Sequence, residues 1–349
     1  MPSALILKGP RELAFEDLPD TPLAATEVRI RTLFSGISAG TELSQYRGSN
    51  PFMTKRWDEG RRLFVEGEGR SWDYPVRNLG YEEVGEIVEV GREVSHVGPG
   101  QRVFGTWGHR THHVAPLDYV LPRLMPEGAD PRIGVFSHIG AVALNGVHDG
   151  NIRIGDTVAV FGLGVQGQIV AQAARRSGAD VIGIDPVASR RDMAVRLGVQ
   201  EALDPGAGGI AEIIKERTGG LGADVCIEVS GAPAALGEAI RSVSYSARVV
   251  ALGFFQGEAR GLHLGEEFHH NRVNLVSSQI SGVAPEASYR WTKPRLWQTA
   301  VRLQQEGVLS LLPLITDVAP FKEAPALFDR LDRGAEGVLQ AMLSFEDVA

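Results

Sequence analysis

The stretch DTVAVFGLGVQGQIVAQAARRSG, residues 156–178, decides the fold class of this 349-residue chain. An apolar run is followed by Gly162, Gly164 and Gly167 in G-x-G-x-x-G spacing, and then by a helical pattern. The first glycine permits a tight turn, the second lets backbone approach a pyrophosphate, and the third lets helix and strand pack closely. Because the motif follows a strand and opens a helix, it predicts a dinucleotide site.

The segments that follow this stretch repeat the same alternation. DVIGID (180–185), ADVCIEVSG (223–231) and ARVVALGF (247–254) are strand-like, and helical patterns separate them. Strands that alternate with helices of 10–15 residues indicate a parallel, doubly wound sheet. The strands are continuous apolar runs, as expected when helices cover both faces. The fold class is therefore α/β, and NLVSSQISG (274–282) is a candidate last strand.

The start of the first helix, at Val165 and Gln166, offers unpaired N–H groups and partial positive charge to phosphates. Asp185 ends the second strand, where a carboxylate accepts hydrogen bonds from both ribose hydroxyls and repels a 2′-phosphate. This favours NAD over NADP. Arg190 and Arg191 leave the phosphate tolerable, so NADP stays open as an alternative.

Other strand ends of such a sheet also meet the cofactor. Ser230, Leu252 and Gly253 follow the later strands, and we expect them to line the nicotinamide side.

Composition restricts the remaining possibilities. A net charge of −8 argues against a nucleic-acid partner, and the absence of an 18-residue apolar run argues against a membrane span. A single cysteine excludes an internal disulfide and a four-cysteine zinc site. With no signal-peptide pattern at the N-terminus, we expect a cytoplasmic protein.

The first 135 residues have a different texture, with short β-like segments between Gly, Pro and Asp. These segments are EVRIRTLFSGIS (27–38), YEEVGEIVEVG (81–91) and DYVLPRL (118–124). Residues 49–77 are charged and weakly periodic, and we interpret them as a long surface loop with one possible helical turn, either a lid or a solvated insertion. The C-terminal part reads helix, strand, helix and is expected to pack on this first domain.

Together these segments resemble the medium-chain dehydrogenase/reductase family, the relatives of alcohol and sorbitol dehydrogenases. The resemblance covers nearly the whole chain. It is carried by SGISAGTEL (35–43), NLGYEEVGEIVEVG (78–91), VGPGQRVFG (97–105), IRIGDTVAVFGLGVQG (152–167) and PLITDVAPFKEAPALFDRLDRG (313–334). SGISAGTE is also locally similar to the bacteriochlorophyllide dehydrogenase subgroup.

The resemblance implies a GroES-like, β-rich catalytic domain over residues 1–138 and 285–349, and a Rossmann domain over 139–284. It also implies an active site in the cleft between them and a homodimer or homotetramer. The sequence departs from the family at the zinc ligands. The family's zinc cysteine falls at Ser38 or Ala39, its histidine at Tyr81, and its third ligand at Ser137 or His138. Too few good zinc ligands remain, so no metal site is predicted.

Alcohol oxidation without zinc requires protic groups that move the proton or hydrogen-bond to the oxygen. We assign Tyr81 and His138 as the acid/base pair, Glu82 as the group that orients them, and Thr41 as a proton relay. Each has a structural alternative. Tyr81 can fill the vacated metal position, His138 can be a structural histidine, Glu82 can pair behind the cofactor, and Thr41 can close a turn.

The function that follows is NAD-dependent oxidation of a secondary alcohol, or reduction of the ketone, without catalytic zinc. The small-molecule substrate is expected to be a polyol or a sugar-like compound. Two alternatives stay open. One is an NADPH-dependent enoyl or quinone reductase, and the other is a non-catalytic nucleotide-binding sensor.

Overall fold

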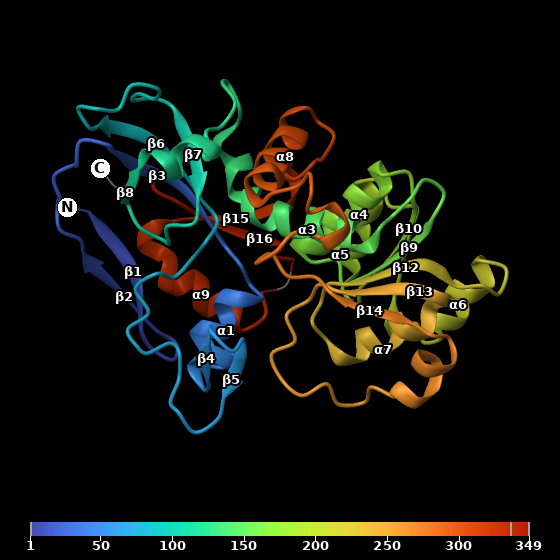
Figure 1. Cartoon of the computed structure of the whole chain (residues 1–349). Coiled ribbons are helices and arrows are strands. Elements are labelled where there is room, and N and C mark those ends of the chain that lie inside the picture. Colours follow the sequence, from blue (N-terminus) through green and yellow to red (C-terminus); the bar gives the residue numbers. More distant parts are fainter. Residues whose placement is uncertain (1, 336, 348–349) are drawn as a thin grey trace. The chain divides into compact units, whose positions relative to one another are not determined.

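The computed structural model describes residues 2–335 and 337–347, and the chain divides into two compact units (Figure 1). One unit comprises residues 1–138 and 312–349, and the other comprises residues 139–311. The first division coincides with the boundary expected after residue 138. The second differs from the expected position, because residues 285–311 lie in the unit of the parallel sheet.

The unit of residues 139–311 is built on a six-stranded parallel sheet in the order β11-β10-β9-β12-β13-β14. The α/β fold class is therefore confirmed. The strands are β9 (Thr157–Phe161), β10 (Asp180–Ile184), β11 (Glu201–Leu203), β12 (Ala223–Glu228), β13 (Val243–Ala251) and β14 (Asn274–Ser277). Its helices are α3 (Ser137–Gly150), which begins at the end of the other unit, α4 (Val165–Arg176), α5 (Ala188–Arg196), α6 (Ile210–Arg217), α7 (Pro233–Ser242) and α8 (Lys293–Gln305).

Helices cover both faces of this sheet, with α4 and α5 on one side and α6 and α7 on the other (Figure 1). Apart from Thr157 and Asp224, the residues of the central strands β9 and β12 are buried, which explains their apolar sequences. Cys226 of β12 is fully buried among them, as expected for a core thiol.

Helix α8 and the segment after it belong to this unit because they contact its helices. A side chain at Gly140 of α3 would meet Ala300 of α8 at 2.8 Å, so the two helices cross closely. The Gln172 side chain of α4 exchanges two hydrogen bonds with the backbone of Ser310. The sequence pattern of residues 285–311 is that of an amphipathic helix, which does not say which unit it packs against.

The other unit contains a mostly antiparallel sheet in the order β15-β16-β3-β6-β7, with β8 also paired to β3. Its strands are β1 (Ser3–Gly9), β2 (Glu12–Asp17), β3 (Glu27–Ile37), β6 (Glu83–Val90), β7 (Arg102–Gly105), β8 (His112–Pro116), β15 (Ile315–Pro320) and β16 (Gln340–Ser344). Helices α1 (Thr41–Arg47), α2 (Leu117–Val120) and α9 (Ala324–Asp332) accompany them. A core of Leu5, Leu43, Leu79, Phe328 and Leu343 joins α1 and α9 to this sheet.

One expectation for this unit was wrong, and another, which included the helical turn found at Pro51–Met53, was incomplete. Residues 118–124 are helical rather than extended, because α2 is followed by a 3-10 turn at Leu121–Arg123, where Pro122 has no N–H for a β-ladder. Residues 49–77 are not a plain loop. After a 3-10 turn at Pro51–Met53 they contain the hairpin of β4 (Arg56–Asp58) and β5 (Leu63–Val65).

Two aromatic side chains of the hairpin and two that flank it, Phe52 and Trp72, pack on one another. The Phe52 and Trp72 rings stack with centroids 4.7 Å apart, and Trp57 meets Phe64 edge to face at 5.0 Å. Such contacts between residues far apart in the segment produce no periodicity that a sequence pattern would reveal. Among residues 2–335 and 337–347, no helix is long and apolar enough to cross a membrane.

The glycine motif gives a matched test of this packing. A Cβ on Gly167 would lie 1.8 Å from the carbonyl oxygen of Gly162, whereas a Cβ on Gly164 would have nothing within 4 Å. We expect Gly167→Ala to lower the free energy of unfolding by about 3 kcal/mol or more, because backbone cannot yield to the methyl group. Gly164→Ala should change it by less than about 1 kcal/mol. Urea denaturation followed by circular dichroism would measure both, and equal losses would contradict the expectation.

Candidate functional site

The glycine turn between β9 and α4 leaves the start of α4 open. Gly162 has φ +97°, and a side chain there would meet the backbone nitrogen of Ser230 at 2.9 Å. Gly164 is the residue before the helix, and no side chain caps the helix there. Within the described residues, the Nε2 atom of Gln166 is buried without a hydrogen-bond partner. Open N–H groups, an unsatisfied amide and the unobstructed surface at Gly164 fit a bound pyrophosphate.

Asp185 directly follows β10 and is buried, with 2% of its surface exposed. One carboxylate oxygen accepts the N–H of Leu163 at 2.7 Å, and the other accepts the N–H of Val187 at 2.8 Å. Each oxygen keeps a second lone pair, so the carboxylate can still accept from ribose hydroxyls. The residue therefore holds the glycine turn and also stands where a ribose would lie.

The two arginines near Asp185 differ in how they are held. Arg191 donates to the backbone oxygen of Asp185 at 2.7 Å and pairs with Asp204 at 3.1 Å, so both ends of its guanidinium are engaged. Arg190 lies 3.7 Å from the Asp185 carboxylate, and 37% of its side chain is exposed. Arg190 is therefore the cation better placed to meet a ribose phosphate.

The other strand ends carry the remaining expected cofactor residues. Ser230 donates its hydroxyl to the buried carboxylate of Glu228, which also accepts the Ser230 N–H at 2.7 Å. Leu252 is buried and lies over Gly146 of α3. A side chain at Gly253 would meet the backbone nitrogen of Gly231, in the turn after β12, at 2.2 Å. In the described structure these three residues hold the strand ends together.

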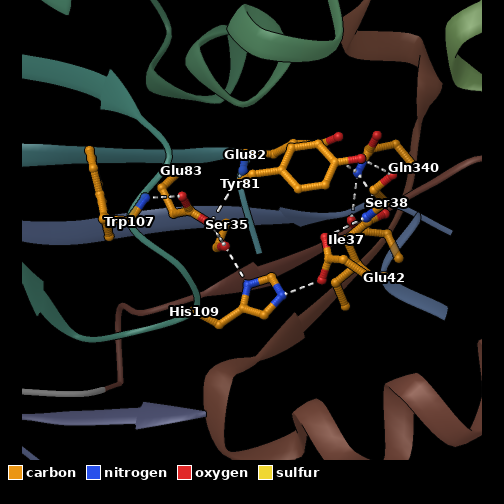
Figure 2. Close-up of polar contacts among 11 residues, drawn as sticks. Ser35, Ile37, Ser38, Glu42, Tyr81, Glu82, Glu83, Trp107, His109 and Gln340 are labelled. Atoms are coloured by element: carbon orange, nitrogen blue, oxygen red, sulfur yellow. Dashed lines mark hydrogen bonds and ion pairs between the residues drawn. The ribbon is translucent and has the colours of Figure 1, made fainter. Parts of the chain in front are cut away.

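Tyr81 lies at the centre of a polar cluster in the other unit (Figure 2). Its hydroxyl donates to the hydroxyl of Ser38, 43 residues earlier in the chain. The Thr41 hydroxyl, at the start of α1, also hydrogen-bonds with it. The ring of His138 meets the Tyr81 ring edge to face, with centroids 5.2 Å apart. The fold therefore brings Tyr81, Thr41 and His138 together, with Ser38 added to them.

Glu82 lies behind this cluster with 1% of its surface exposed. Its carboxylate accepts the side-chain amide of Gln340 at 3.2 Å, and a side chain at Gly36 would meet it at 2.4 Å. Gln340 also donates to the backbone oxygen of Ile37 at 3.3 Å. Glu82 is thus tied to the backbone that leads to Ser38.

Buried negative charge controls the protonation of these groups. Burial, followed by the charges of Glu82 and Glu42, raises the pKa of Tyr81 far above its usual value, against the opposing hydrogen bonds from Ser38 and Thr41. To act as a base, Tyr81 would need surroundings that lower its pKa. The net effect of its surroundings is to raise the pKa. Burial and the charges of Glu42 and Glu83 likewise raise the pKa of Glu82 well above its usual value.

A second buried network adjoins this cluster (Figure 2). His109 contacts Glu42 through Nε2 at 2.8 Å and Ser35 through Nδ1 at 2.5 Å. Ser35 in turn donates to Glu83 at 3.1 Å. Burial raises the pKa of Glu83 to about 7, against the opposing charge of His109. Burial lowers the pKa of His109, but Glu42 and Glu83 outweigh it and the net shift is upward.

The donor set at this position does not fit zinc. The resemblance places the family's cysteine ligand at Ser38 or Ala39 and its histidine ligand at Tyr81, and the hydroxyls of Ser38 and Tyr81 are hydrogen-bonded to each other. Zinc sites in proteins use thiolate, imidazole or carboxylate. Across residues 2–335 and 337–347, no group of three or more His, Cys, Asp and Glu side chains could hold a metal ion.

Sequence reasoning missed four members of these networks, namely Ser35, Glu42, Glu83 and His109. Glu42 and Glu83 each directly follow a residue already singled out, Thr41 and Glu82, and that adjacency was the available signal. His109 had no comparable signal, because it lies in a loop and meets Glu42 across 67 residues of sequence.

Comparisons with known proteins place the chain among dehydrogenases. The model of the zinc-binding dehydrogenase family matches residues 165–298. The chain is 35% identical to the D-guloside 3-dehydrogenase of Escherichia coli over 92% of its own length and 93% of that protein. It is 27% identical to the (R,R)-butanediol dehydrogenase of Bacillus subtilis, over 88% and 89%. A zinc-binding dehydrogenase structure from Sinorhizobium meliloti, bound to NADP, has the same fold, with a TM-score of 0.79, 22% identity and 99% of both chains covered.

The raised pKa of Glu82 makes a prediction about stability. A carboxyl whose pKa is higher in the folded state stabilises the fold below its ordinary pKa, and that contribution is lost as the pH rises through the folded value. We therefore expect Glu82→Gln to stabilise the protein increasingly from pH 5 to pH 9, reaching at least about 1.4 kcal/mol, the equivalent of one pKa unit. Thermal unfolding across this range would measure the difference from wild type.

The matched control is Glu93→Gln, on an exposed glutamate of the same unit. Its difference from wild type should stay nearly constant with pH. A Glu82→Gln difference that is equally flat would contradict the buried charge.

Proposed function

This chain belongs to the family of zinc-binding dehydrogenases, the medium-chain dehydrogenase/reductases. From that membership we propose that it oxidises a secondary alcohol with NAD, and from its site residues we propose that it does so without catalytic zinc. The reverse reaction reduces the corresponding ketone. The observation that carries the proposal is the Tyr81–Ser38 hydroxyl pair, which stands where the family's metal ligands would be.

The substrate class follows from the relatives and from the polar cluster. The E. coli relative, 35% identical across nearly the whole chain, is named for oxidation of a D-guloside at carbon 3. The butanediol and sorbitol dehydrogenases among the relatives are named for polyols. Hydroxyl, imidazole and carboxylate groups near Tyr81 suit a substrate with several hydroxyls. A polyol or a sugar derivative is therefore the substrate we propose.

The proposed cofactor is NAD because of the position of Asp185. Its buried carboxylate leaves lone pairs for the ribose hydroxyls, and its charge opposes a 2′-phosphate. Arg191 is engaged elsewhere, so Arg190 alone is available to offset that charge. NAD supplies the hydride acceptor, and the protein residues must manage the proton.

Proton movement is constrained by the buried charge near Tyr81. A free alkoxide would be destabilised in a buried site beside the Glu42 carboxylate, so the proton leaves the substrate oxygen as the hydride leaves carbon. Tyr81 stays a neutral phenol because its pKa is raised. Its role is then to donate a hydrogen bond to the substrate oxygen in exchange for its bond to Ser38, or to pass a proton along the hydroxyls of Ser38 and Thr41.

His138 is the group we assign to accept the proton. Its ring borders the Tyr81 ring, and imidazole is the side chain best suited to exchange protons near neutral pH. Glu82, held by Gln340, is the group we assign to orient Tyr81, its neighbour in the chain. No step requires a metal, consistent with the poor donor set.

We also propose that the protein is a cytoplasmic homodimer or homotetramer with no nucleic-acid or membrane partner. In support, β14 is the edge strand of the parallel sheet and exposes Leu275, and an open edge strand is a surface for strand pairing. The local similarity of SGISAGTE to bacteriochlorophyllide dehydrogenases extends no further than that segment, and we do not infer a pigment substrate from it.

The cofactor preference can be measured by thermal shift. We expect NADH to raise the melting temperature more than NADPH at equal concentration, because ligand binding stabilises the folded state in proportion to affinity. Asp185→Asn should lower the ratio of NADH affinity to NADPH affinity at least about tenfold, the equivalent of 1.4 kcal/mol, because it removes the charge that opposes the 2′-phosphate. Arg190→Ala is the matched control. It should weaken the binding of NADPH and leave the binding of NADH unchanged. Preference for NADPH in the wild type would favour the reductase alternative.

Metal-independent turnover is the direct test of the chemistry. After exhaustive chelation, the protein should still oxidise members of a panel of polyols and glycosides with NAD. In the same protein Tyr81→Phe and His138→Ala should each lower kcat by about 100-fold or more, as expected for removal of an acid/base group. Initial rates at 340 nm with metal analysis of the same samples would measure this.

Three outcomes would contradict it. Activity that requires added zinc would restore the family's metal mechanism. Full activity in both variants would remove Tyr81 and His138 from the chemistry. NADH binding without turnover on any alcohol would favour a sensor.

A further inference from the structure

The buried network around His109 is not used by the proposed chemistry, yet it touches the groups that are. We propose that His109 is a positioning residue that holds the Tyr81–Ser38 hydroxyl pair in place through Glu42. This inference rests on the proposed function, which assigns that hydroxyl pair to the substrate oxygen.

The backbone of His109 is held from two sides. Its N–H donates to the backbone oxygen of Leu79 at 2.8 Å, and its carbonyl accepts the N–H of Leu5 at 2.8 Å. Gly80 leaves room for the ring, since a side chain there would meet the imidazole carbon at 2.8 Å and would require φ +100°. Only 1% of the His109 surface is exposed. The ring therefore has little freedom to move.

One arrangement of protons satisfies every contact of His109, with both ring nitrogens as donors. In it the Ser35 hydroxyl donates to Glu83 and accepts from Nδ1, while Nε2 donates to the Glu42 carboxylate. Backbone N–H groups of Trp107 and Gly108 also point at Glu83 and favour its carboxylate form. We assign His109 as an imidazolium between two carboxylates on this basis.

Glu42 transmits this position to the hydroxyl pair. One of its oxygens accepts from His109 at 2.8 Å, and the other accepts the backbone N–H of Ser38 at 2.9 Å. The Ser38 hydroxyl is the partner of Tyr81. Three short contacts therefore run from a rigid imidazolium to the Tyr81 hydroxyl, and Figure 2 shows them in sequence. The arrangement also neutralises a carboxylate that would otherwise lie buried beside the substrate oxygen.

A double-mutant cycle tests this assignment. His109→Gln should lower kcat about tenfold with little change in KM in the wild-type background. In the Tyr81→Phe background it should lower kcat less than about threefold, because the hydroxyl it positions is already gone. His112→Gln is the matched control, since that half-buried ring contacts the side chain of its neighbour Thr111. It should leave kcat within about twofold in both backgrounds. Equal losses from His109→Gln in both backgrounds would overturn the inference.

A second readout does not depend on turnover. In protein labelled with 3-fluorotyrosine, the six tyrosines give separate fluorine signals, and Tyr81→Phe identifies the one from Tyr81. His109→Gln and Glu42→Gln should each shift or broaden this signal, and His112→Gln should leave it in place. Glu42→Gln serves if His109→Gln does not fold. A Tyr81 signal unmoved by the variants that fold would overturn the positioning role.

The two measurements separate the inference from the proposed function. If the wild type shows no turnover, the proposed function fails, while the fluorine signal still decides whether His109 holds Tyr81. If Tyr81→Phe lowers kcat but the cycle is additive, the proposed function stands and the inference fails.

Discussion

Three buried glutamates set the conditions for everything near Tyr81. Glu42, Glu82 and Glu83 each expose 1% of their surface or less. Buried carboxylates are costly unless they are paired, and here one imidazole, one amide and several backbone N–H groups must serve all three. The Ser35 hydroxyl, which donates to Glu83, is a further partner. Negative charge that these partners do not neutralise raises the pKa of Tyr81 and of Glu82.

In the proposed reaction, this negative environment has the opposite effect to a metal ion on the charge of the substrate oxygen. A zinc ion would stabilise an alkoxide, whereas carboxylates beside the substrate oxygen disfavour one. Hydrogen-bonding hydroxyls at Ser38 and Tyr81, with a tyrosine that stays protonated, suit a reaction in which proton and hydride depart together. The same buried charge raises the pKa of His109, and a protonated ring there offsets part of it.

The dinucleotide unit depends on a different constraint, namely the close approach of backbone segments. Gly162, Gly167 and Gly253 each lie where a side chain would meet backbone at less than 3 Å. Sequence reasoning recognised the first two because their spacing is a local signature. It placed the β-α alternation of this unit correctly for the same reason. It assigned residues 285–311 to the other unit, because an amphipathic helical pattern does not show which unit the helix packs against. It assigned residues 118–124 to a strand, because a short apolar segment is compatible with a strand or a helix.

The sequence by itself determined the parallel sheet, the glycine turn and the presence of Tyr81 where a metal ligand is usual, because these are properties of neighbouring residues. Only the tertiary structure decided what Tyr81 meets. Ser38 is 43 residues away from it, and His109 reaches Glu42 across 67 residues, so the chain's topology had to bring them together. The pKa of Tyr81 was likewise beyond a sequence pattern, since burial and the distances to Glu42 and Glu82 exist only in the folded chain.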